Sequence, residues 1–496
     1  MQLDTAKIAQ DSRALSTKDT DSGSHLVCLL GTSFDIARLP HGNVLKQRIK
    51  AARHKLAADC PFHAILPNTQ GTRISLLVVD PAQSTFELLT QARKTISYQR
   101  SPVPATLGLA CFGLDAKQAE RACEALIAAA LAADFVMPDF KSKREPATRL
   151  KQIRIYGHKA QHGYVRTLAE ARGNNLARFL TALPPNELTP GNYRQRVVKL
   201  ARAYGWKTDF LDIKKLKGRG AGAFLAVAQG SPEPDAGILH LSYAPKKKSN
   251  QGALALVGKG LCFDTGGTNL NPARHMHGMH EDMEGSAVAL GTLLALTELK
   301  VDFPVDCWLA LAQNHIGPKA YKQNDVVTAA NGTTIEIMHT DAEGRMVLAD
   351  TLTFASRAKP RLIMDYATLT GACVGALSTR MSGAVTNRME LVPTVIEAGW
   401  ESGERVWPFP LEKDYHKALK SSIADMKQCT LDSDADHIIA ASFLSKFIEG
   451  DMPWVHIDLS AGNHKGGLAH IQTDITGFGV RFSLNLLLNQ KAMAQV

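Results

Sequence analysis

Short apolar runs alternate with longer helical stretches from about Trp206 to the C-terminus. Runs with the length and composition of buried strands are Gly237–Tyr243, Ala253–Val257, Val305–Leu311, Leu362–Tyr366 and Trp454–Leu459. Stretches typical of helices lie between them, at Gly285–Leu299, Val347–Arg357 and Asp436–Ile448. This alternation predicts an α/β fold, with helices on both faces of a mostly parallel central sheet. Ligand sites in such folds lie beyond the carboxyl ends of the strands.

The amino-terminal part of the chain has a different pattern and no recognisable chemical motif. Strand-like runs begin at Leu26 and Arg73, and the clearest helix is Ala116–Asp134. A charged stretch at Lys141–Pro146 is typical of a boundary. A helix over Tyr164–Leu183 is expected to end at the two prolines that follow. The expected organisation is a smaller domain over residues 1–160 without catalytic residues, a linker helix over 161–185 and a larger domain over 186–496.

Composition narrows the class of protein. The chain has 496 residues, of which 45% are apolar and 21% charged, which is globular usage and excludes disorder over most of its length. No apolar run approaches the ~20 residues of a membrane-spanning helix. The polar start does not have the apolar core of a secretory signal. The 8 cysteines occur singly, without a CxxC pair, which favours reduced thiols and a cytoplasmic location.

The net charge of +10 comes partly from short basic clusters. These clusters are Lys141/Lys143/Arg144, Lys214/Lys215/Lys217/Arg219 and Lys246/Lys247/Lys248. Solvated loops and helix ends account for them most simply. The alternative is a nucleic-acid surface, for which neither interleaved aromatic residues nor a known motif is present.

Two segments place charged residues at the end of a strand and at the start of a helix. In VGKGLCFDTGG, Lys259 and Asp264 follow an apolar strand that is predicted to end at Val257. In HEDMEG, Asp282 stands where a helix begins. An acidic residue there can cap the helix or bind a ligand, and both readings remain open.

A third segment, HTDAEGR, follows a predicted strand over Thr333–Met338. Asp341 and Glu343 are two residues apart, so on an extended segment both side chains point the same way, and Arg345 follows. Clustered carboxylates repel one another unless cations neutralise them. Oxygen ligands favour one or two divalent ions, such as Mn, Mg, Zn or Co, which can activate water without a nucleophilic serine or cysteine. Cys262 is accordingly expected to be a small buried side chain.

The same segments resemble the cytosolic leucyl aminopeptidases, a family of dinuclear-metal exopeptidases. Further similar stretches are NNLARFLTALPPNELTP, GAGAFLAVAQGS, MDYATLTGACVGAL and HIDLSAG, so that the likeness extends from Asn174 to the C-terminus. The resemblance implies a metal-dependent aminopeptidase that removes a leucine-like N-terminal residue from peptides by metal-activated water. It also implies two metal ions per subunit, Mn or Zn above Mg or Co, and a homohexamer. By position, residues 1–160 correspond to the family's small α/β domain.

The resemblance also implies a role for each matching residue. The metal ligands would be Lys259, Asp264, Asp282, Asp341 and Glu343. Arg345 would hold a bicarbonate-like anion, the presumed general base, with Ala342, Gly344 and Leu369 around it. Met279, Thr368 and Gly371 would line the substrate pocket. A lysine ligates a metal only as the neutral amine, so we expect burial and metal to lower the pKa of Lys259.

One position departs from the family pattern. Asn271 stands where the family has a second lysine that polarises the scissile carbonyl, and losing such a donor typically costs about 10²–10³ in rate. The chain is therefore a slow peptidase, an enzyme of altered preference, or an inactive relative with a structural or nucleic-acid-binding role. His275, His277 and His280 lie nearby, either as a solvated loop or, with Arg274, as a partial replacement for the lysine.

Overall fold

The computed structural model describes residues 3–100, 102–143, 148–247, 249–432 and 434–496. The chain forms two compact units, one of Met1–Arg172 with Lys465–Asp474 and one of Gly173–His464 with Ile475–Val496. The border between them falls within helix α5 (Val165–Thr181). Pro146 of the predicted boundary, and Arg144 and Lys248 of the basic clusters, lie outside the described residues.

The first unit is built on a six-stranded sheet in which all neighbouring strands are parallel except β3 and β4. In sheet order its strands are β1 (Lys7–Asp11), β6 (Gln152–Tyr156), β5 (Thr106–Phe112), β2 (His25–Gly31), β4 (Arg73–Val79) and β3 (Phe62–Ile65). Its helices are α1 (Thr17–Ser22), α2 (Gly42–Ala51), α3 (Thr85–Gln99) and α4 (Ala116–Asp134).

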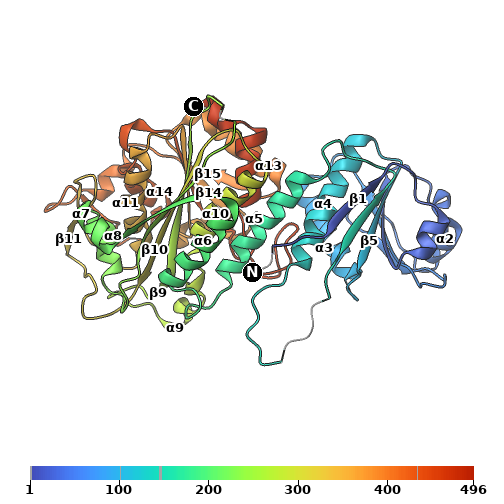
Figure 1. Ribbon diagram of the computed structural model, residues 1–496, viewed down its shortest axis with the longest axis horizontal. Helices are drawn as coiled ribbons and strands as arrows, with labels where there is room; N and C mark the ends of the chain where they lie inside the picture. The colour runs from blue at the N-terminus through green and yellow to red at the C-terminus, as the bar shows by residue number, and fades with distance from the viewer. Residues whose placement is uncertain (1–2, 101, 144–147, 248, 433) are drawn as a thin grey trace. The chain divides into compact units, whose positions relative to one another are not determined.

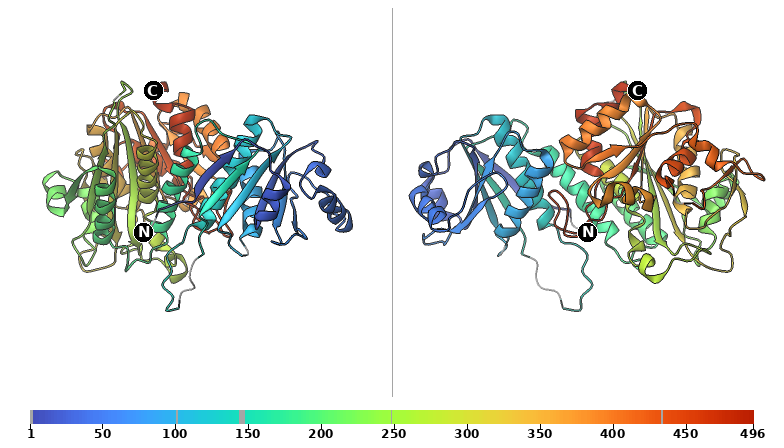
Figure 2. Two further views of the ribbon diagram at one scale, coloured as in Figure 1. Left: turned by 45° about the vertical axis from the view of Figure 1, so that its right-hand side comes forward. Right: turned by 180° about the vertical axis from the view of Figure 1, so that it is seen from behind.

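Both faces of this sheet are covered, because the apolar residues of its central strand alternate between two cores. Val27 and Leu29 of β2 pack in the core that includes residues of α3 and α4. Cys28 and Leu30 pack in the core that includes Leu45 of α2. Figures 1 and 2 show α2 on one face and α3 with α4 on the other. A continuous apolar run is expected for a strand that is buried on both sides.

The second unit contains an eight-stranded mixed sheet. In sheet order its strands are β15 (Val406–Pro408), β14 (Ser382–Thr386), β17 (Trp454–Asp458), β13 (Leu362–Ala367), β9 (Leu254–Asp264), β10 (Val305–Asn314), β8 (Gly237–Tyr243) and β7 (Lys207–Asp212). The four central strands β17, β13, β9 and β10 are parallel, and antiparallel pairs flank them on both sides. The predicted two-domain α/β fold is confirmed.

Helices cover both faces of this sheet as well. Figure 1 shows α8, α11 and α14 on one side of the strands and α6 and α10 on the other. The helices of this unit are α6 (Pro190–Tyr204), α7 (Ile213–Gly218), α8 (Gly222–Ala228), α9 (Ala273–Met276), α10 (Glu284–Glu298), α11 (Glu343–Arg357), α12 (Gly371–Leu377), α13 (Val392–Ser402), α14 (Asp436–Ser445), α15 (Val480–Leu484) and α16 (Ala492–Gln495).

Two predicted boundaries near the motifs were wrong. Strand β9 does not end at Val257 but continues to Asp264, so Lys259 lies inside the strand. Gly258 does not break the strand; it permits close packing, because a Cβ there would lie 2.4 Å from Ser286 Cα of α10. Helix α11 begins at Glu343, four residues before the predicted start, since an acidic residue is favourable in a first helical turn.

The remaining features concern smaller elements and the surface. A three-stranded sheet of β11 (Val326–Thr328), β12 (Thr334–Glu336) and β16 (Met426–Lys427) lies in the second unit. The described lysines and arginine of the basic clusters are exposed. All eight cysteines are free. Within the described ranges, no helix combines the length and the apolar composition that a membrane span requires.

Candidate metal centre

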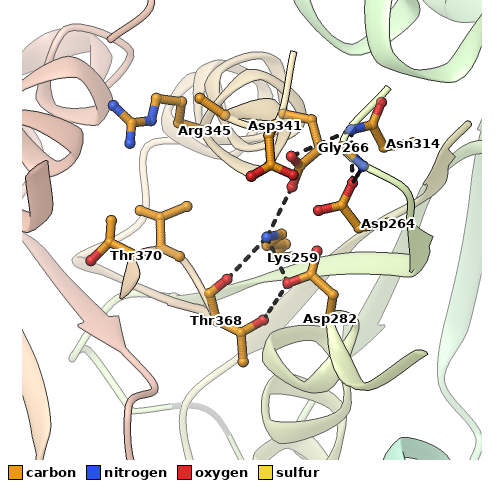
Figure 3. A network of polar contacts seen from close by, with 12 residues as sticks. Lys259, Asp264, Gly266, Asp282, Asn314, Asp341, Arg345, Thr368 and Thr370 are labelled. Atoms are coloured by element: carbon orange, nitrogen blue, oxygen red, sulfur yellow. Dashed lines mark hydrogen bonds and ion pairs between the residues drawn. The ribbon is translucent and has the colours of Figure 1, made fainter. Parts of the chain in front are cut away.

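Lys259 lies at the centre of a polar network in the second unit (Figure 3). Strand β9 carries the side chain, and its Nζ is 2.7 Å from Asp282 Oδ1 and 3.1 Å from Glu343 Oε1. The same ammonium donates to the main-chain oxygen of Thr368, which follows β13, at 3.0 Å. Thr368 Oγ1 in turn donates to Asp282 Oδ1 at 2.8 Å. Three neighbouring segments thus converge on one buried lysine.

Gly344 makes room for this lysine. A Cβ at position 344 would lie 2.6 Å from Lys259 Cε and 2.7 Å from its Nζ. A larger residue at this position would have to push the lysine side chain aside, so the glycine leaves the lysine in place.

Asp264, Asp341 and Glu343 form a tight carboxylate cluster, each with an oxygen within 4.8 Å of the others. Asp264 Oδ1 accepts from the main-chain N–H of Gly266 and from Asn314 Nδ2, both at 2.8 Å. These donors fix the carboxylate at the carboxyl end of β9. Such a convergence of oxygen ligands is suited to a hard divalent cation.

Asp341 and Glu343 converge for a different reason from the one the sequence suggested. They do not share an extended segment, because Asp341 lies in a turn and Glu343 is the first residue of α11. Asn271 Nδ2 donates to Asp341 Oδ1 and thereby orients this carboxylate. Asp282 does not cap α10, whose N-cap residue makes no side-chain hydrogen bond. Its Oδ1 accepts from Lys259 Nζ and from Thr368 Oγ1 instead.

The carboxylates resist ionisation in this arrangement. Burial, reinforced by the charges of Glu343, Asp282 and Asp341, holds the pKa of Asp264 well above its ordinary value. Burial likewise raises the pKa of Asp282 to about 7. Burial together with the charge of Glu343 raises the pKa of Asp341 to about 6. Burial and the repulsion between neighbouring carboxylates both make their negative charges costly, so the site favours the binding of a cation.

Lys259 does not behave as the resemblance led us to expect. Burial opposes its positive charge, but the charges of Asp282, Glu343 and Asp264 outweigh burial and raise the pKa of Lys259. The expected lowering is therefore not found in the protein alone. A metal ion that replaces the ammonium among these carboxylates would have to displace its proton first.

Arg345 lies apart from the carboxylate cluster. Figure 3 shows its guanidinium pointing away from Lys259, and its Nη2 lies 2.9 Å from both carboxylate oxygens of Asp436. The position implied for a bicarbonate-like anion thus already contains an acidic partner from α14. Of the other implied anion positions, Leu369 donates its N–H to Asp458 and Ala342 accepts from Gln428 Nε2.

A cavity of about 390 Å³ opens onto the metal-ligand candidates. Met279, Thr368 and Gly371, which the resemblance places around the substrate, line it. So do residues that sequence reasoning did not assign to the substrate pocket: Glu281, Glu284, Thr379, Ser460 and Asn463. Burial, with the charges of Glu281 and Glu404, holds the pKa of Glu284 well above its ordinary value.

The histidines of the loop over residues 274–280 do not line this cavity, although Met279 of the same loop does. His275 and His277 are exposed, and His275 Nε2 accepts from Arg274 Nε at 3.0 Å. His280 is half-buried, and neither it nor Arg274 lines the cavity. The arrangement corresponds to the solvated-loop interpretation. Cys262 is buried, as expected for a small side chain without a catalytic role.

Comparison with known proteins identifies the class. The model of the cytosol aminopeptidase family, catalytic domain, matches residues 175–484. A probable cytosol aminopeptidase of Stutzerimonas stutzeri is 42% identical over 344 residues, which are 67% of this chain and 68% of the relative. One from Synechococcus sp. (strain WH7803) is 40% identical over 359 residues, 71% of this chain and 72% of the relative. The chain therefore belongs to the cytosol aminopeptidase family.

Solved structures give the same result. A mutant of tomato leucine aminopeptidase superposes with a TM-score of 0.85 at 27% identity, covering 98% of this chain and 97% of that one. The bottromycin maturation enzyme BotP in complex with Mn has a TM-score of 0.81 at 28% identity, covering 95% of this chain and 100% of that one. The recognition made from the motifs is confirmed, and the similarity in fold includes the amino-terminal unit.

Proposed function

We propose that this protein is a metal-dependent aminopeptidase that removes the N-terminal residue from peptides in the cytoplasm. The observation that supports this most directly is the convergence of Asp264, Asp341 and Glu343 beside Lys259 and Asp282, at the end of a cavity large enough for a side chain. The resemblance points to leucine-like first residues as the initial test substrates and to a homohexamer, which light scattering can test.

The five residues of this cluster fit two divalent ions in type and number. We assign Asp264, Asp341 and Glu343 to one ligand set and extend it with Asp282 and Lys259. Manganese or zinc suits this mixture of carboxylates and an amine better than calcium, which takes oxygen ligands alone. When bound, such ions supply Lewis-acid polarisation of the carbonyl and an activated water.

The chain's own residues would prepare the site for this chemistry. Asn314 and the N–H of Gly266 hold Asp264 in place, and Thr368 holds Asp282. Asn271 orients Asp341, and the resemblance places it, as a neutral donor, where the family has a lysine that polarises the carbonyl. Because an amide does not carry charge, we propose a lower rate than a lysine at this position would give.

Arg345 is proposed to bind the bicarbonate-like anion in exchange for Asp436. A guanidinium offers a forked pair of donors to either partner, so the two anions would compete for the same atoms. The rival function, a catalytically weakened structural or nucleic-acid-binding protein, is supported by Asn271 and by the net charge of +10.

An assay with metal-stripped protein tests the function. The protein is treated with chelator, reloaded with Mn, Zn or Co, and incubated with leucyl anilide and with its N-acetylated form. We expect metal-dependent cleavage of the free-amine substrate alone. Asp264→Ala and Glu343→Ala should lower kcat/KM by about 10³ or more, since each removes a candidate ligand.

The matched control is Asp209→Ala, which removes an exposed carboxylate of the same unit. Its activity and metal content should equal those of the wild type. Full metal-stimulated activity in both site variants would overturn the metal assignment.

A further inference from the structure

Glu284 is a buried carboxylate at one wall of the active-site cavity. It is the first residue of α10, it is 1% exposed, and it lines the same cavity as the metal-ligand candidates. Its Oε1 has no hydrogen-bond partner among the described residues. Neither the metal cluster nor the catalytic roles described above make use of it.

The chain makes space for this carboxylate. Gly462 lies against it, and a Cβ at position 462 would be 2.1 Å from Glu284 Oε2. Ser460 and Asn463, on either side of this glycine, also line the cavity. A side chain at 462 would displace the carboxylate, so the glycine and the glutamate form one built feature of the wall.

The charges around Glu284 are negative. Glu281 also lines the cavity, and its Oε2 accepts from Asn463 Nδ2 at 2.8 Å. Glu404 lies close enough to affect Glu284, but its Oε2 accepts from the N–H groups of Gly479 and Phe482. Among the lining residues the cation is Lys259, which Asp282 and Glu343 engage.

A buried carboxylate without a partner is costly, and a cationic group that enters the cavity would relieve that cost. An ammonium or guanidinium would also form charge-assisted hydrogen bonds, which are roughly twice as strong as neutral ones. A leucine side chain would leave the carboxylate unpaired. The wall therefore discriminates by charge, while Met279 and Gly371 bound the same cavity by shape.

We propose that Glu284 is a specificity-determining residue that selects peptides whose N-terminal side chain is a cation, lysine or arginine. This inference rests on the proposed aminopeptidase function and refines the leucine-like preference that the family resemblance implies. Position 284 directly follows the Asp282-Met283 pair, so the preference is set within one turn of the metal centre.

The test compares lysyl anilide with norleucyl anilide, which has a similar straight chain without the charge. For the wild-type, metal-loaded protein we expect kcat/KM to be about tenfold higher for the lysyl substrate. Glu284→Gln should abolish that ratio, mainly by raising KM for the lysyl substrate. Glu397→Gln, which removes an exposed carboxylate of α13, is the matched control and should keep the wild-type ratio.

Three further readings separate the outcomes. Metal content of Glu284→Gln should equal that of the wild type, and a loss of metal would mean that Glu284 serves the ions rather than the substrate. Gly462→Ala should also reduce the lysyl preference, which provides a second variant if Glu284→Gln does not fold. Calorimetry should show tighter binding of lysinamide than of norleucinamide by the wild type.

Equal cleavage of lysyl and norleucyl substrates by the wild type would overturn this inference and leave the aminopeptidase function intact. If none of the aminoacyl anilides is cleaved with any of the metals, the function itself fails. In that case calorimetry still decides whether the wall prefers a cation, and equal binding of the two amides would overturn the inference as well.

Discussion

Asp134 in the first unit and the cluster of Asp264, Asp341 and Glu343 in the second both hold carboxylates away from water. Asp134, at the end of α4, is 2% exposed and meets Arg100 Nη1 at 3.2 Å and Arg149 Nε at 2.9 Å. It also accepts from the N–H of Leu150 at 2.7 Å. One carboxylate there has two cations and a main-chain donor.

At the cluster in the second unit, negative groups outnumber positive ones. There the three clustered carboxylates and Asp282 have one lysine in their midst. A buried ion pair with satisfied hydrogen bonds can be structural, whereas an uncompensated cluster reduces stability and persists where a ligand completes it. Both units are α/β structures with parallel central strands, so the difference in charge balance, not the fold, distinguishes the unit that carries chemistry.

Asp134, whose charge is balanced by two arginines, forms the balanced site. Removing its carboxylate should have the largest effect on stability. In Asp134→Ala, Arg100 and Arg149 lose their shared partner, and we expect the free energy of unfolding of the first unit to fall by about 3–5 kcal/mol. Urea denaturation followed by circular dichroism measures this loss. Asp139→Ala, an exposed carboxylate nearby, is the control, and metal binding should remain unchanged in both. An unaltered unfolding curve for Asp134→Ala would mean that the two sites do not differ in this way.

The carboxylate cluster around Lys259 is the unbalanced site. A steric change there should have the second-largest effect, a loss of activity. Gly344→Ala places a methyl group against Lys259, so we expect kcat/KM to fall by about 10–100-fold while the protein remains folded. Gly375→Ala in α12 is the matched control, because a Cβ there meets nothing within 4 Å. Equal activities of the two variants would show that the close approach to Lys259 is not required.

Adding a cation at the unbalanced site makes it more like the site of Asp134. We expect Asn271→Lys to raise kcat for simple aminoacyl substrates by about tenfold or more, since an ammonium stabilises a developing oxyanion better than an amide does. The effect should lie in kcat, because the oxyanion exists only in the transition state. Steady-state kinetics at fixed metal concentration measures it. An unchanged or lower kcat at equal metal occupancy would show that the site is built around the Asn271–Asp341 contact.

The smallest expected effect has the opposite sign from that at Asp134. Asp264→Asn keeps an oxygen for Gly266 and Asn314 and removes one negative charge from the cluster. We expect the metal-free protein to gain about 1 kcal/mol of stability while metal binding is lost. Thermal unfolding in the presence of a chelator measures the gain. A loss of stability would indicate that the cluster is already balanced without a metal.

The sequence was most informative where local pattern and tertiary packing agree. Helix α4 begins at Ala116 and ends at Asp134 as predicted, because Asp115 caps it and its apolar face is long. The strand runs from Gly237 and from Val305 were also found at their predicted starts. The family resemblance brought the five metal-ligand candidates together, and the structure shows them in contact or close to one another.

Sequence reasoning failed where tertiary contacts override local preference. The strand was predicted to end at Val257, but it continues through Gly258, which lets α10 pack closely against it. The pairing of Arg345 with Asp436 joins residues far apart in the chain, so spacing could not predict it. The sequence pattern assigned no role to Glu284, because its burial against Gly462 is visible in three dimensions alone.

The way the chain divides between its units has a consequence for how such proteins can be recombined. The segment Lys465–Asp474 is counted with the first unit although it lies far downstream, and Arg93 Nη1 of α3 donates to Gly466 and Ile471 within it. Helix α5 also runs unbroken through the border at Gly173. A single crossover between two related genes at that border would therefore exchange most of one unit, but it would cut a helix and leave Arg93 to meet a foreign loop. Natural or engineered shuffling of the amino-terminal unit must bring this loop along with it.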